Sequence, residues 1–144
     1  RAEAELLQND PEKSGLLTAR IAADMHPLPH QIWFTCRQPE LLLAKLTGTP
    51  VREFEVETAT FADLLTLVAD TIARIDAQAA DDSFTTSNTQ LEIPGFPTLP
   101  ISGQDYIDEW LTPNFYFHLA TAYNILRHNG VDIGKGDFLG APKD

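Results

Sequence analysis

The four histidines are the side chains of this sequence best suited to acid–base or metal chemistry: His26, His30, His118 and His128. His118 lies in the apolar, aromatic stretch NFYFHLATAYNILRHNG, residues 114–130. Helical spacing places His118 on the apolar face of this stretch and His128 at the surface near its C-terminal end. Because imidazole titrates near neutrality, His118 is the best candidate for a general acid or base. The alternative is a core histidine that has found a hydrogen-bond partner.

A metal site is the second kind of chemistry that these histidines suggest. Such a site needs about three protein ligands that converge at roughly 2 Å. His26 and His30 flank a Pro-Leu-Pro step, where both could face a pocket or water. No two histidines are expected to supply ligands from one helical turn, so the residues alone do not define a metal site.

Other catalytic motifs give no better candidate. Cys36 has no histidine within a turn on its helix and no G-x-S-x-G motif occurs, so we expect a buried, inert thiol. The acidic stretches 53–57 and 105–109 are expected to face water. The sequence GVDIGKGDFLG, residues 130–140, lacks the glycine spacing and the following helix of a phosphate-binding loop. We interpret it as a helix end and a turn-rich tail.

Composition limits the class of protein. The 144 residues, 43% hydrophobic and 22% charged, fit one globular domain over residues 1–144. A net charge of −11 disfavours nucleic-acid binding, and no apolar run approaches the roughly 18 residues that span a membrane. One cysteine allows no internal disulfide, and no signal-peptide pattern opens the chain. We therefore expect a cytoplasmic protein.

Local signals predict the first helices. The opening RAEAELLQND resembles the last turns of a helix stopped by an Asp-Pro step, so we expect further sequence upstream. A helix is predicted from Pro29 to about Leu46 and is ended by Gly48. Proline removes a backbone hydrogen bond and crowds the preceding turn, so this helix is expected to be kinked or split at Pro39.

An extended connection over residues 47–59, with its glutamates facing water, leads to the clearest helix. Thr60 caps that helix and Asp63 occupies its third position. Asp70 and Arg74 are expected to pair on its outer face. Six residues form the apolar stripe: Phe61, Leu64, Leu65, Val68, Ile72 and Ile75.

The last third of the chain predicts a hairpin and a long helix. The hairpin lies in LEIPGFPTLPI, residues 91–101, with Leu91 and Ile93 opposite Leu99 and Ile101. Ser102 caps a helical start, Pro113 restarts the helix and Gly130 ends it. The tail after Gly130 has too many glycines for a helix and is expected to pack back on the helices.

Three stretches of the sequence are similar to a known family: DMHPLPHQ, SGQDYI and NFYFHLATAYNILRHNGVDIGKGDFLG. Together they resemble an uncharacterised family of small proteins in the DinB/YfiT-like superfamily of four-helix bundles. The resemblance covers nearly all of the chain from LLTARIAADM onward. It implies an all-α, up-down-down-up bundle with a long crossover between helices 2 and 3, a truncated first helix here, and the small hairpin before the last helix.

The resemblance also implies a possible metal. Active members of the superfamily are similar to metal-dependent hydrolases, transferases and isomerases that hold a divalent ion, such as Zn, Ni or Mn, with one histidine on helix 2 and two on helix 4. His118 matches the first helix-4 ligand, but Ala122 stands at the second position. With antiparallel helices, residues 38–41 are expected to lie level with His118, and Glu40 is the ordinary ligand among them. His30 is expected about 15 Å from His118 along the axis.

We therefore expect a DinB-like bundle that binds a small molecule in a pocket near His118. The other residues expected around this pocket are Tyr123, Tyr116, Trp110, Asp24 and His26. One alternative is a residual metalloenzyme that uses His118 with Glu40, His26 or His30. The other is a noncatalytic homodimer that associates through an apolar helix face.

Overall fold

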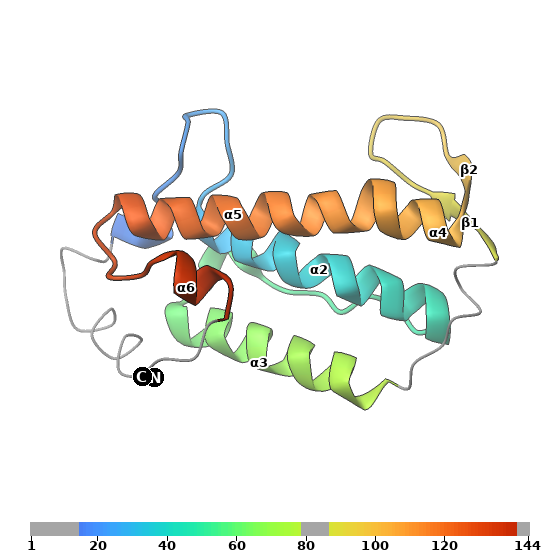
Figure 1. Ribbon diagram of the computed structural model, residues 1–144, viewed down its shortest axis with the longest axis horizontal. Helices are drawn as coiled ribbons and strands as arrows, with labels where there is room; N and C mark the ends of the chain where they lie inside the picture. Colours follow the sequence, from blue (N-terminus) through green and yellow to red (C-terminus); the bar gives the residue numbers. More distant parts are fainter. Residues whose placement is uncertain (1–14, 79–86, 141–144) are drawn as a thin grey trace.

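The computed structural model describes residues 15–78 and 87–140 of the chain. The predicted end of a first helix, at residues 1–10, lies outside the described residues. Three long helices, α2, α3 and α5, run side by side, and a two-stranded hairpin stands at one end of them (Figure 1). None of the described helices is long and apolar enough to cross a membrane.

Helix α2, Leu28–Thr47, begins after Pro27 and ends at Gly48, whose φ of 68° provides the left-handed cap. Glycine takes this conformation at no steric cost, which explains the predicted stop. Pro39 lies inside the helix, which continues through it as one element. The helix is therefore not split at this residue. Cys36 is buried, as predicted, and Leu43 of the same helix is buried as well.

The connection from α2 to α3 is extended and carries one short 3-10 helix, η2, Val56–Thr58. Helix α3, Phe61–Ala77, starts at the capping box that Thr60 and Asp63 form. The colours of Figure 1 show that α2 and α3 run in the same direction and that α5 returns antiparallel to them. A parallel pair of helices needs a long crossover, and residues 48–60 provide it.

The apolar stripe of α3 is only partly covered. Leu64 and Leu67 are buried, but Leu65 and Ile72 each expose 53% of their surface. The predicted pair on the outer face is wrong, because Asp70 contacts Arg52 of the crossover and Arg74 reaches Glu40 of α2. Helix α3 therefore attaches to α2 through charged contacts as well as through its leucines.

The hairpin consists of β1, Asn88–Leu91, and β2, Leu99–Ser102, in antiparallel register. Leu91 pairs with Leu99 as expected, but Ile101 pairs with Thr89, because Ile93 belongs to the loop and not to the strand. Leu91 packs against Tyr106, and apolar residues of α2, of the hairpin and of the segment Tyr106–Leu111 pack against this pair.

The last helical stretch contains three segments. Helix α4, Gly103–Asp105, is capped by Ser102, the π-helical segment η4 covers Tyr106–Leu111, and helix α5 covers Thr112–His128. Pro113 has no N–H for the carbonyl four residues back, which accounts for the wider turn before it. The side chain of Asn114 donates to the Trp110 carbonyl oxygen at 2.7 Å. This bond satisfies a carbonyl in the wide turn.

The segment after α5 differs from the prediction that it forms no helix. Gly130 ends the helix with a φ of 82°, as predicted. The tail then forms a four-residue helix, α6, Lys135–Phe138, although its glycines predicted none. The backbone N–H of Gly134 donates to the Asp137 carboxylate at 2.8 Å, and this bond caps the single turn.

The register between α2 and α5 is also different from the expectation. His118 lies beside Gln31 and Phe34, about two turns from the predicted level at residues 38–41. The cause is the overhang of α5 past the start of α2. There Ile125 packs with Leu28 and with Leu16 of the connecting segment.

Candidate functional site

A hydrogen-bonded pair connects α2 with α5. His118 Nδ1 lies 2.8 Å from Oε1 of Gln31, and Nε2 of Gln31 donates to the backbone carbonyl of His26 at 2.9 Å. Gln31 is 2% exposed. Because its NH2 group is used by the His26 carbonyl, its oxygen faces the imidazole and can only accept. His118 must therefore carry its proton on Nδ1.

The charge state of His118 follows from its surroundings. Burial lowers the pKa of His118 below its usual value, and the nearby His26 lowers it further. The ring stacks on Phe34 at a centroid distance of 4.8 Å. The imidazole is therefore neutral near pH 7, with Nε2 unprotonated. Nε2 has no hydrogen-bond partner among the residues that the structure describes.

His118 lines a cavity of about 500 Å³ between α2, α5, η4 and the hairpin. Aromatic walls come from Phe34, Tyr106 and Trp110. The buried amide of Gln38 also lines the cavity, and its Oε1 has no partner within the described residues. Two residues that line the cavity thus carry an acceptor without a hydrogen-bond partner in the described part of the chain: His118, at Nε2, and Gln38, whose Oε1 is buried.

Two cations, Arg37 and Lys45, border the same cavity. The guanidinium of Arg37 lies 5.2 Å from the centre of the Trp33 ring, and the Lys45 ammonium donates to the Gln90 carbonyl at 2.9 Å. Lys45 also lies 5.0 Å from the centre of the Tyr106 ring. Neither cation has a carboxylate partner in the described part of the chain.

Glu92 is the acidic residue that lines this cavity. Burial raises the pKa of Tyr106, and the charge of Glu92 raises it further. The phenol is therefore neutral near pH 7 and remains a hydrogen-bond donor and acceptor. Two cations and one carboxylate give this cavity a local excess of positive charge in a chain whose net charge is −11.

The pocket residues predicted from the sequence lie in different places. Trp110 lines the cavity together with His118. His26 is outside the cavity lining, but its carbonyl holds Gln31. Tyr116 is 55% exposed and packs edge-on against Phe115, while Asp24 is exposed. Tyr123 lines a second cavity.

That second cavity, about 470 Å³, is an apolar groove between α2, α3, α5 and α6. Tyr123 contacts Phe138 there at a ring distance of 5.5 Å. Cys36 lines it as well, and burial raises the pKa of this thiol. Few polar groups line the groove, so it lacks the converging donors and acceptors that define a recognition site.

The histidines of the predicted metal set do not fit a three-ligand site. His26 precedes α2, and its ring stacks on His30 at 4.8 Å with an angle of 12° between the planes. Lone pairs lie in the ring planes, so stacked imidazoles do not converge on one ion. His30 Nε2 contacts Glu57 Oε1 at 3.2 Å. Ala122, at the position of the missing ligand, is buried in the core.

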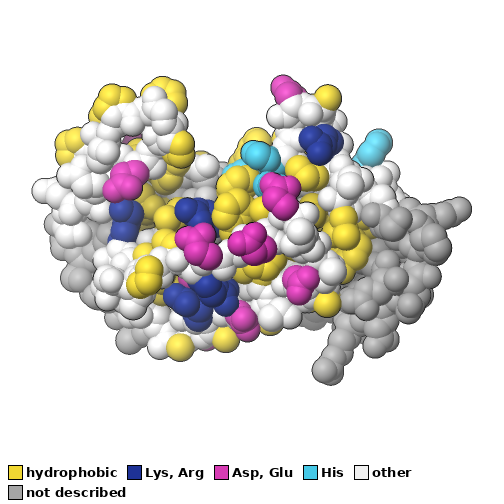
Figure 2. All heavy atoms as spheres, turned by 180° about the vertical axis from the view of Figure 1, so that it is seen from behind, with side chains coloured by type: hydrophobic (Ala, Val, Ile, Leu, Met, Phe, Trp, Pro, Cys, Tyr) yellow, Lys and Arg dark blue, Asp and Glu magenta, His cyan; other side chains and the backbone are white. Residues whose placement is uncertain are grey.

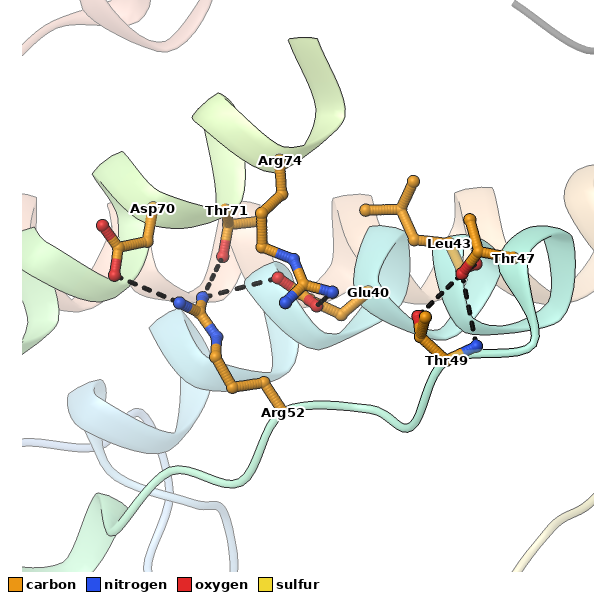
Figure 3. Close-up of polar contacts among 8 residues, drawn as sticks. All are labelled: Glu40, Leu43, Thr47, Thr49, Arg52, Asp70, Thr71 and Arg74. Atoms are coloured by element: carbon orange, nitrogen blue, oxygen red, sulfur yellow. Dashed lines mark hydrogen bonds and ion pairs between the residues drawn. The ribbon is translucent and has the colours of Figure 1, made fainter. Parts of the chain in front are cut away.

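Glu40, the remaining predicted ligand, is held by two arginines (Figure 3). Arg52 of the crossover lies 3.4 Å from Oε1, and Arg74 of α3 lies 3.1 Å from Oε2. A metal ion would have to displace both guanidinium groups. Across the described residues, no group of three or more His, Cys, Asp and Glu side chains could hold a metal ion.

The face opposite that of Figure 1 shows the distribution of charge (Figure 2). Acidic and basic side chains lie next to one another in the middle of this face, and histidines lie beside hydrophobic side chains above them. No large area of this face carries basic side chains alone. That the chain does not bind nucleic acid stays a prediction.

Four residues around the cavity were absent from the predicted site: Gln31, Arg37, Gln38 and Lys45. The sequence carries a signal for three of them, because residues 34, 37, 38, 41 and 45 share one face of a helix. This face carries the two cations and the amide of Gln38 next to the apolar Phe34 and Leu41, a mixture that is typical of the wall of a ligand cavity. By spacing, Gln31 lies on this face as well, three positions before Phe34, but the sequence could not show its partner, which is 87 positions away.

A solved structure with the same architecture identifies the fold. The chain is similar to a crystal structure of a DinB family member protein from Shewanella denitrificans, with a TM-score of 0.78 and 34% identity. The match covers 99% of this chain and 80% of that one. The fold is therefore that of a DinB-like helical bundle, as the resemblance implied.

The family model defines the group more narrowly. Residues 1–139 match the family described as "Domain of unknown function (DUF1993)", and the chain belongs to that family. No curated protein shows significant similarity to the chain.

Proposed function

We propose that this DUF1993 protein binds a small molecule in the cavity between α2, α5, η4 and the hairpin. The observation that carries the proposal is the Gln31–His118 hydrogen bond, which leaves the unprotonated Nε2 of a neutral imidazole on a residue that lines the cavity. Gln38 adds a buried acceptor. A cavity of this size with aromatic walls and a few polar groups is typical of a ligand site.

The chemistry of the pair favours recognition over acid–base catalysis. A catalytic histidine is usually oriented by a carboxylate, which stabilises the imidazolium that forms when the base takes a proton. Here the orienting group is the neutral amide of Gln31. An amide fixes the tautomer but gives the imidazolium no charge partner, and burial already lowers the pKa of His118. Nε2 is therefore suited to accept a hydrogen bond from a ligand O–H or N–H.

The π-helical segment gives independent support. Wide turns of this type occur frequently at functional sites. Tyr106 and Trp110 both come from η4 and both line the cavity. The wide turn thus places two aromatic rings on the wall opposite α2.

A fragment screen by NMR tests the proposal. We expect hits that carry an O–H or N–H donor to shift the imidazole signals of His118 and the indole signal of Trp110. His118→Phe keeps the ring that stacks on Phe34 and removes the acceptor, so hit affinity should fall about fivefold to tenfold. His128→Phe is the matched control, because His128 is exposed at the end of α5. Hits whose affinity is equal in both variants, or that shift only residues of the apolar groove, would contradict the proposal.

A further inference from the structure

Arg37 is the least compensated cation among the residues that line the cavity. Arg52 and Arg74, by contrast, both reach carboxylates within 3.4 Å. Arg37 has only the face of Trp33 beside it, and no carboxylate or carbonyl accepts its five N–H donors in the described part of the chain. Lys45 uses one of its three donors on the Gln90 carbonyl.

The position of Arg37 favours a planar or tetrahedral anion. A guanidinium that stacks on an indole keeps its N–H edge free, and that edge matches a carboxylate or a phosphate in a two-pronged geometry. Lys45 starts eight residues further along α2, about 12 Å along the axis, where the cavity meets the hairpin. The cavity therefore has a cation near the His118 level and another near the hairpin.

The uncharged part of the cavity constrains the rest of the ligand. Gln38 follows Arg37 directly in α2, and its buried Oε1 needs a donor. His118 Nε2 can accept a hydrogen bond as well. Phe34, Trp110 and Leu41 line the space around these acceptors and suit a flat apolar body.

We propose that the ligand is a small organic acid: a carboxylate or phosphate that meets Arg37, joined to a flat apolar body with a hydroxyl or N–H that meets Gln38 Oε1 or His118 Nε2. This inference rests on the proposed function and specifies the ligand of the same cavity. Glu92 opposes an anion in the cavity, so its removal should strengthen binding.

Matched acid and amide probes test the inference on the full chain. We would titrate para-hydroxyphenylacetate and para-hydroxyphenylacetamide, which share ring and hydroxyl and differ in charge, and follow the His118 and Trp110 signals by NMR. Phenyl phosphate distinguishes phosphate from carboxylate as the preferred anion. The acid should bind at least about tenfold more tightly than the amide, and its affinity should fall as salt is added.

Variants assign this preference to its residue. Arg37→Gln should abolish the difference between acid and amide, Arg37→Lys should keep part of it, and Glu92→Gln should raise the affinity of the acid about threefold. Arg127→Gln, at an exposed position in the last turn of α5, should change nothing. Thermal unfolding of each variant verifies that it is folded.

Two outcomes would overturn the inference in different ways. Equal binding of acid and amide would overturn the preference for an anion, and an acid preference that survives in Arg37→Gln would overturn its assignment to Arg37. Both results would leave the binding proposal in place. No shift of His118 or Trp110 with any of the three probes would overturn the inference, and the fragment screen, whose hits carry no required charge, then decides the binding proposal separately.

Discussion

Oε1 of Gln31 accepts a hydrogen bond from Nδ1 of His118 across the α2–α5 interface, at 2.8 Å. The same amide donates to the His26 carbonyl at 2.9 Å, so both ends of the Gln31 side chain are fixed. This one buried residue therefore determines which nitrogen of His118 carries the proton.

Replacing Gln31 should affect stability and His118 together. Gln31→Leu removes two hydrogen bonds and leaves the His118 N–H and the His26 carbonyl without partners. We expect unfolding free energy to fall by about 1–3 kcal/mol in denaturant titrations. Thr35→Val, which removes a local hydroxyl bond to the Gln31 carbonyl, should cost less. Equal losses in the two variants would contradict a special role for the Gln31 amide.

Gln31→Glu should move the pKa of His118 in the opposite direction from burial. A carboxylate beside Nδ1 stabilises the imidazolium, so the pKa of His118 should rise toward or above its usual value. The titration of the His118 ring protons by NMR measures this directly. An unchanged pKa in Gln31→Glu would show that the two side chains are not in contact in solution.

Stability should decrease as the solution becomes acidic. Because the pKa of His118 is lowered in the folded protein, the unfolded chain binds a proton first, at its usual pKa of about 6.5. The lost stability therefore begins below about pH 6.5 and grows as pH falls toward the folded pKa. We expect the midpoint temperature to drop less between pH 7.5 and 5.5 in His118→Gln than in the wild type. A steeper drop in the variant than in the wild type would mean that folding raises the pKa of His118 instead of lowering it.

The buried carboxylate of Glu40 should contribute more to stability than the exposed one of Asp70. Glu40→Gln leaves two arginines without their shared partner, and since these are partly exposed, we expect a loss of about 2 kcal/mol. Asp70→Asn removes an exposed carboxylate from Arg52 and should cost less than about 1 kcal/mol. Denaturant titrations of both variants measure the two losses. A larger loss in Asp70→Asn than in Glu40→Gln would contradict the prediction.

Cys36 should be unreactive in the folded protein. Burial raises the pKa of this thiol, which reduces the thiolate at pH 8. Labelling with a maleimide should therefore be slow in buffer and fast in denaturant. Equal rates in the two conditions would mean that the groove around Cys36 opens readily to solvent.

The parts of the fold that could be predicted depend on residues close in sequence. The Thr60–Asp63 capping box, the stop at Gly48 and the start at Ser102 each use a side chain and backbone groups within a few positions. Such signals are readable because their energies do not depend on the rest of the chain.

The parts that could not be predicted depend on how helices meet. The level of His118 follows from the packing of Ile125 on Leu28 and Leu16, which no local pattern encodes. The partner of Asp70 is Arg52 of the crossover and not Arg74 of its own helix. The spacing of residues within α3 could not show that the crossover passes close to Asp70. The inward direction of His118 was predictable from helical periodicity, but its acceptor, Gln31, came from another helix.

The proposed site depends on His118 being a neutral imidazole that carries its proton on Nδ1 and leaves Nε2 to accept a hydrogen bond. Side-chain ¹⁵N chemical shifts of His118, recorded near pH 7 through the two-bond couplings to the ring protons, test it most directly. We expect a protonated, pyrrole-type Nδ1 and an unprotonated, pyridine-type Nε2. A proton on Nε2 instead, or on both nitrogens at this pH, would contradict it.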